Sequence, residues 1–387
     1  MALSSFGPTF PRLFLAALLQ EISFILMIHF PGYLEDLGVT ESWIGLLYAA
    51  AAVLALLMRP ALGRLLDLTH RRTVLLFAGA GNIVFMLLMV TTTVWGPWLW
   101  MIFLFHKILL ISLFTTILTY GADSIPTEHR TQGLALFGLS GLIPIAIGGV
   151  LGDVVIEEVG FDGLFILSAA AMLGSWLTVW TLPVLPIMGR RPRRGFWHAL
   201  AQRDLLPLWW VTLTFSIGME TLFTFTRTYV SERQVGSAGL FFGVYGLTAA
   251  TTRIFGGSRY DRLPQSPLII GSILSLAVCL AVMAVAGSAA VLIVAAVAGG
   301  MAHGALFPIL SSQVVKRART AERGSAMSIF TSIFDFSLLL SAPIVGAAID
   351  GFDYRVAFGA VAIVIVLGAV VYAIWDRRLS LVEAGVG

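Results

Sequence analysis

Long apolar stretches, separated by short polar or glycine- and proline-containing segments, run along the whole chain. Stretches such as Leu268–Gly287 carry no charge over about 20 residues, the length at which a helix crosses a hydrocarbon core of roughly 30 Å. The strand alternation of a membrane barrel is absent, and lipid cannot satisfy free backbone groups, so these stretches predict helices. The pattern predicts twelve spans, at residues 11–34, 42–63, 73–94, 98–121, 133–156, 163–186, 206–230, 238–257, 267–287, 289–312, 325–349 and 354–375.

Composition agrees with a membrane bundle. Of the 387 residues, 58% are hydrophobic and only 12% are charged, whereas soluble proteins carry about 25% charged residues. Twelve spans leave too little chain for a large soluble domain, so we predict an all-α membrane protein and exclude a water-soluble enzyme. The single cysteine, Cys279, lies inside an apolar stretch, so the chain forms no intrachain disulfide.

The basic residues collect in alternate connections. Most of the 24 Lys and Arg residues fall in the two termini and every second loop, whereas only Arg233 and Arg355 fall in the opposite loops. The positive-inside rule therefore places both termini in the cytoplasm, which requires an even number of spans. The net charge of +3 is explained by topology, so no nucleic-acid partner is expected.

The two halves of the sequence repeat each other. We predict a six-helix half at 1–187, a basic cytoplasmic linker at 188–204 and a second six-helix half at 205–387, related by an axis along the membrane normal. The linker charges are interpreted as ordinary cytoplasmic retention rather than a lipid-specific site. The repeat pairs Arg59, Gly63 and Asp67 with Arg253, Gly257 and Asp261, Glu21 with Glu220, and Gly160-Phe161-Asp162 with Gly351-Phe352-Asp353.

The segment GRLLDLTHRR at 63–72 resembles the loop between spans 2 and 3 of the major facilitator superfamily, Gly-x-Leu-x-Asp-Arg-x-Gly-Arg-Arg. The matching positions are Gly63, Leu65, Asp67, Arg71 and Arg72. Together with the repeat, the resemblance covers the whole chain. It implies the twelve-helix major facilitator fold and a transporter that works by alternating access, and we expect a monomer without cofactors.

The resemblance also implies that Asp67 latches the outward-facing state at a cytoplasmic gate. Asp123, at the end of span 4, can pair with Arg130, pair with a gate arginine, or only shape its loop. Arg59 and Arg253 can serve the gate or simply snorkel to the membrane surface. The candidate gate residues are Arg59, Gly63, Asp67, Arg71, Asp123, Arg130, Arg253, Gly257 and Asp261.

Span 5 carries a glycine- and proline-rich stretch, Gly141 to Gly149 with Pro144, that is similar to a motif of antiporters in this family. The alternative is a packing face, in which Gly148 and Gly152 lie against small residues of span 8, Gly239 and Gly243.

Charged and titratable residues inside spans are functional candidates, because each costs at least about 2.5–3.5 kcal/mol at mid-membrane. In the family, spans 1, 4, 7 and 10 line the central cavity, and each of these spans carries such residues here. Glu21 and Glu220, equivalent in the repeat, are expected to face each other, and burial and like charge favour at least one bound proton on the pair. The candidates for the substrate and proton cavity are Glu21, His29, His106, Lys107, Glu220, Arg227, His303 and Asp335.

Several of these residues have two interpretations. Lys107 can hold a carboxylate ionised or bind an anionic substrate, and His29, His106 and His303 can relay protons or simply pack through hydrogen bonds. No two candidate ligands lie at i, i+4 on one helix, so no bound metal is predicted and metal transport is a minority alternative.

The sequence therefore predicts a secondary transporter of the cytoplasmic membrane that exports a small amphipathic or charged organic compound in exchange for protons. The alternatives are proton-coupled uptake of a polar metabolite such as an organic acid, and movement of a lipid-type substrate. No Gly-x-Ser-x-Gly, His-Glu-x-x-His or Gly-x4-Gly-Lys-Ser/Thr motif is present, so neither an enzyme nor a nucleotide-driven pump is expected.

Overall fold

The computed structural model describes residues 7, 9–125, 133, 136–186, 196–260, 262–319 and 322–383. Within these ranges the chain is helical and contains no strand. Ten helical segments of the described chain are long and apolar enough to cross a membrane. An all-α membrane protein is therefore confirmed for the described chain.

The first group of helices lies between residues 10 and 180. They are α1 (Phe10–Leu26), a 3-10 turn η2 (Met27–His29), α2 (Phe30–Asp36), α3 (Glu41–Leu68), α4 (Arg71–Met89), α5 (Pro97–Ser124) and α7 (Leu139–Trp180). The later ones are α8 (Phe196–Leu200), η4 (Arg203–Leu205), α9 (Leu206–Arg233), α10 (Ala238–Tyr260), α11 (Gln265–Ala284), α12 (Ala289–Arg317), α13 (Arg323–Gly351) and α14 (Tyr354–Glu383).

Two helices differ from the predicted spans. The 42 residues of α7 cover two predicted spans, and the helix leaves helical geometry at Gly160, where φ is 74° and ψ is −173°. Glycine reaches this conformation without the steric cost of a side chain. The 23-residue α10 is not among the ten candidate membrane helices.

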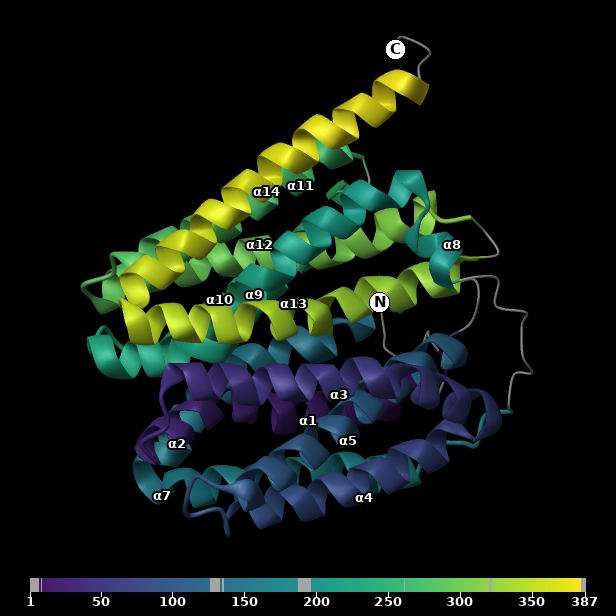
Figure 1. Cartoon of the computed structure of the whole chain (residues 1–387). Coiled ribbons are helices and arrows are strands. Elements are labelled where there is room, and N and C mark those ends of the chain that lie inside the picture. Colours follow the sequence, from purple (N-terminus) through teal and green to yellow (C-terminus); the bar gives the residue numbers. More distant parts are fainter. Residues whose placement is uncertain are drawn as a thin grey trace. The chain divides into compact units, whose positions relative to one another are not determined.

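The chain forms two compact units that do not follow the sequence order strictly. Unit 1 comprises Met1–Val39, Val53–Gly189 and Ala238–Gly246, and unit 2 comprises Thr40–Ala52, Arg190–Ser237 and Leu247–Gly387. The start of α3 thus packs in unit 2, and the start of α10 packs in unit 1. Figure 1 shows α14 running beside α11 in unit 2, where the two helices contact each other.

The core of unit 1 is built by α1, α4, α5 and α7. Phe10, Leu13, Ile117 and Met172 are almost completely buried in one apolar cluster. Other large apolar side chains point outward, such as Phe77 with 78% exposure, as expected for helix faces in contact with lipid.

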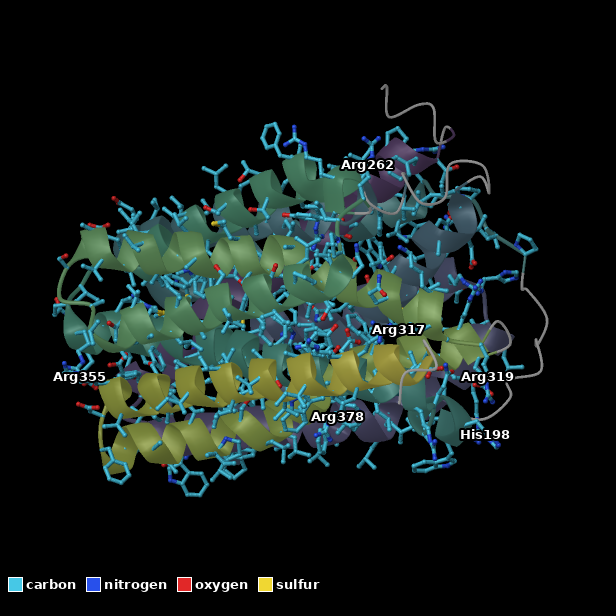
Figure 2. All side chains as sticks on the ribbon, turned by 90° about the horizontal axis from the view of Figure 1, so that it is seen from above. His198, Arg262, Arg317, Arg319, Arg355 and Arg378 are labelled. Atoms are coloured by element: carbon cyan, nitrogen blue, oxygen red, sulfur yellow. The ribbon has the colours of Figure 1, made fainter. Side chains whose placement is uncertain are left out.

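The two ends of unit 2 differ in charge. Arg355 lies at one end of the helices, whereas Arg317, Arg319 and His198 lie toward the other end (Figure 2). At the Arg355 end, Arg233 forms a salt bridge of 3.3 Å with Asp353. The backbone N–H of Val356 also donates to Asp353 at 2.8 Å, and this hydrogen bond is the main reason that the pKa of Asp353 lies below its ordinary value.

Candidate functional site

A break in the first membrane helix places His29 against α7. The α-helical geometry of α1 ends at Leu26, and His29 closes the 3-10 turn before Pro31 in the first turn of α2. The His29 ring is completely buried, with Nε2 3.1 Å from the carbonyl oxygen of Gly149 and Nδ1 3.5 Å from a carboxylate oxygen of Asp153. His29 is thus part of a buried polar contact between the 3-10 turn η2 and α7.

Asp153 was not predicted from the sequence as a site residue. Its carboxylate also accepts a hydrogen bond of 2.6 Å from the backbone N–H of Gly239 in α10. The one available signal was a single acidic residue within the predicted apolar span 133–156.

The predicted glycine packing between spans 5 and 8 is wrong by one residue. A side chain at Gly148 would meet Ile25 of α1, and one at Gly152 would overlap the ring of His29, so these two glycines face α1 and η2, respectively. Gly149 faces α10, because a Cβ atom built on it would lie 3.6 Å from Gly239 Cα. One residue turns a helix by about 100°, which is enough to exchange the neighbouring helix.

His106 and Lys107 on α5 lie in different surroundings. The ring nitrogen Nδ1 of His106 is 3.0 Å from the amide nitrogen of Asn82 on α4, and both side chains are completely buried. This geometry fits the alternative in which His106 simply packs through hydrogen bonds. The ammonium of Lys107 lies 5.1 Å from the ring centre of Phe103, where a cation–π attraction stabilises its charge.

In unit 2, His303 lies among aromatic rings. Its ring centre is 6.2 Å from Phe215 and 6.5 Å from Phe223, both on α9. The guanidinium of Arg253 on α10 lies 5.9 Å from the ring centre of Phe307, one turn from His303 on α12. Arg253, a candidate for the gate, therefore contacts an aromatic cluster that contains a candidate cavity residue.

The remaining candidate residues for the substrate and proton cavity are partly buried. Glu21 lies on α1, and Glu220 and Arg227 lie on α9 with Asp335 on α13. Tyr48, a buried residue of α3, belongs to the same unit as Glu220. The Nε atom of Arg227 is buried and has no hydrogen-bond partner among the described residues.

At the loop between α3 and α4, Arg71 and Asp123 form an ion pair. The Nε atom of Arg71 lies 2.6 Å from the carboxylate of Asp123, and the two side chains are only 11% and 17% exposed. Of the partners considered for Asp123, the structure thus places a gate arginine beside it. The neighbouring Arg72 donates to the carbonyl oxygen of Trp180 at 2.5 Å.

The other candidate gate residues lie on α3, on α10 or outside the described residues. Arg59 and Gly63 lie on α3. Arg130 and Asp261 lie outside the described residues, as does the side chain of Asp67, and Gly257 is described only as part of α10.

The ion pair between Arg71 and Asp123 makes a thermodynamic prediction. Separate alanine substitutions should each lower the thermal stability in detergent, because each leaves one poorly hydrated charge without its partner. The double-mutant cycle should give a coupling free energy of about 1–3 kcal/mol. Additive effects of the two substitutions would show that the pair contributes nothing in solution.

The chain is similar to known membrane transporters over most of its length. The model of the Major Facilitator Superfamily matches residues 12–237 and 234–383. An uncharacterized MFS-type transporter of Salmonella typhimurium is 26% identical over 373 residues, which cover 91% of this chain and 92% of that protein. The multidrug resistance protein MdtG of Yersinia enterocolitica is 23% identical over 384 residues, which cover 93% and 91%, respectively.

Solved structures share the fold at low sequence identity. A POT family transporter in complex with a thioalcohol-conjugated peptide gives a TM-score of 0.80 at 13% identity, covering 95% of this chain and 96% of that chain. The nucleoside transporter NupG gives a TM-score of 0.75 at 16% identity, covering 95% and 98%, respectively.

Proposed function

Because this chain belongs to the major facilitator superfamily and is a transporter rather than an enzyme, we propose that it exports small amphipathic or charged organic compounds in exchange for protons. In this proposal it works as a monomer in the cytoplasmic membrane, by alternating access and without a cofactor.

The proposed topology has twelve spans in two six-helix halves, at 1–187 and 205–387, with both termini in the cytoplasm. The break of α7 at Gly160 supports two spans there, since its repeat partner Gly351 ends α13 just before α14 begins. The 23 residues of α10 are enough to cross a hydrocarbon core of roughly 30 Å. The separation of Arg355 from Arg317 and Arg319 in Figure 2 supports the assignment of sides.

The observation that carries the proposal is the pair of carboxylates inside apolar helices. Glu21 on α1 and Glu220 on α9 are equivalent in the repeat, and each is partly buried. A carboxylate in poorly hydrated surroundings favours the protonated, neutral form and releases its proton when water or a cation reaches it. Such a group can exchange a proton for a positively charged substrate.

Export is the preferred direction because relatives named for multidrug resistance match over nearly the full length of the chain. The aromatic surroundings of His303 and Arg253 fit a substrate with an apolar, ring-containing body.

Proton-coupled uptake of an organic anion is the second candidate. It is favoured by the buried Nε atom of Arg227, which has no hydrogen-bond partner among the described residues and can donate to a carboxylate. Movement of a lipid-type substrate has no specific observation in its favour.

The proposal predicts that purified protein in liposomes moves ethidium, a cationic aromatic dye, when a pH gradient is imposed. The dye should move against its own gradient, in the direction opposite to the protons, and a protonophore should stop it. Uptake of a labelled dicarboxylate together with protons, without movement of ethidium, would instead favour the second candidate. A pH gradient that drives neither compound would contradict proton coupling for both substrate classes.

A further inference from the structure

Two aspartates contact the start of a neighbouring helix in the same way, one in each compact unit. Asp350 lies in the last turn of α13, and Asp153 lies in the first part of α7. The residues that form the two contacts are related by one offset of 197 positions, which pairs Asp153 with Asp350, Gly149 with Gly346, and Ser42 with Gly239.

In unit 2, Asp350 caps α3. One carboxylate oxygen accepts the backbone N–H of Glu41 at 3.1 Å, and the other accepts that of Ser42 at 2.9 Å. These are the first residues of α3, whose N–H groups have no partner within the helix. One turn earlier on α13, Gly346 allows the approach, because a side chain there would collide with the backbone of Glu41.

In unit 1, Asp153 caps α10. Its carboxylate accepts the backbone N–H of Gly239, the second residue of α10, at 2.6 Å. One turn earlier on α7, Gly149 approaches the same residue, with 3.6 Å between a Cβ atom built on it and Gly239 Cα. The same arrangement thus occurs in each unit: a glycine and an aspartate one turn apart on one helix contact the first turn of another helix.

The two contacts are also alike in their place in the predicted repeat. In each of them the aspartate comes from one predicted half of the sequence and the capped helix from the other. A charged acceptor at a helix start gains from the hydrogen bond and from the positive end of the helix dipole. The carboxylate therefore holds the capped helix more firmly than apolar packing alone. An apolar helix face has little preference for contact with another helix over contact with lipid.

We propose that Asp153 and Asp350 are a repeat-related pair of positioning residues for transport. Each carboxylate holds the first turn of its capped helix in the closed arrangement and releases that turn once in every transport cycle. The proposal rests on transport by alternating access, and it is independent of the coupling ion and of the substrate.

The test measures the opening of the two contacts without any substrate. The native cysteine is removed by Cys279→Ser, and one buried alanine is replaced by cysteine as a reporter: Ala49→Cys in α3, or Ala238→Cys in α10. Labelling by a membrane-impermeant maleimide is followed in proteoliposomes. Asp350→Ala should accelerate labelling at position 49, and Asp153→Ala should accelerate labelling at position 238, each about fivefold.

Asparagine variants make the test independent of folding defects. Asp350→Asn and Asp153→Asn keep one acceptor oxygen but lose the charge, so we expect an acceleration of about twofold. The matched control is Glu157→Ala, which removes an exposed carboxylate one turn from Asp153 on the same helix and should leave both rates unchanged.

An unchanged labelling rate at either reporter, in an aspartate variant that still elutes as a single species, overturns the proposal. An equal acceleration by Glu157→Ala also overturns it, because loss of any nearby charge would then have the same effect. Since neither substrate nor gradient is present, failure of proton-coupled export in the ethidium experiment leaves this result unaffected.

Discussion

Replacing Glu220 with glutamine is expected to abolish transport driven by a pH gradient, with a loss of at least about tenfold in the rate of ethidium movement. The substitution keeps the shape of the side chain but removes the group that binds and releases the proton. A neutral amide should also weaken attraction of a cationic substrate, by roughly 1 kcal/mol or more in partly buried surroundings. Initial rates in proteoliposomes at several imposed gradients measure the effect.

The control for this variant is Glu232→Gln on the same helix. Glu232 is exposed near the end of α9, so loss of its charge should change the rate by less than about twofold. If Glu220→Gln retains the pH dependence of the wild type, Glu220 does not carry the coupled proton. Glu21→Gln then becomes the next variant to test, because Glu21 is its partner in the repeat.

Replacing Gly45 with valine is expected to cause the largest loss of stability. A Cβ atom at this position would collide with the backbone carbonyl of Ala342 and lie 3.0 Å from the Cα atom of Pro343, so α3 and α13 would have to move apart. Such overpacking costs about 3 kcal/mol, because backbone atoms cannot rotate away as a side chain can. The melting temperature in detergent should fall by roughly 4 °C.

The same substitution at Gly271 separates the collision from the intrinsic effect of valine in a helix. Gly271 lies within α11, and a Cβ atom there would meet nothing within 4 Å. Gly271→Val should therefore leave the melting temperature nearly unchanged. Equal melting temperatures of the Gly45 and Gly271 variants would mean that the close approach of α3 and α13 does not stabilise the protein.

The apolar pattern of the sequence was sufficient to predict most of the helices. The predicted spans at 98–121 and 289–312 lie within α5 and α12, since an uninterrupted apolar stretch in lipid has few alternatives to a helix. Around residue 160 the pattern predicted the place of a break but not its length. The predicted spans leave residues 157–162 between them, whereas the structure leaves helical geometry only at Gly160.

Candidate site residues were easier to identify than their neighbours. Charged and titratable residues inside or at the end of apolar stretches stand out in the sequence, so His29 and Asp123 could be selected there. Their partners could not be assigned, because the same residue types occur at many positions. Asp153 beside His29, Asn82 beside His106 and Arg71 beside Asp123 are all brought together from distant parts of the chain.

The sequence by itself determined that this protein is a helical membrane transporter of the major facilitator superfamily, because hydrophobic length and the loop motif are local properties. Only the tertiary structure decided which helix faces which neighbour, as Gly149 rather than Gly148 against α10 illustrates. In lipid, a buried helix face and a lipid-facing one are both apolar, so the pattern does not distinguish them. The distinction depends on close backbone approach and on hydrogen bonds such as those of Asp153 and Asp350, which exist only once the helices have packed.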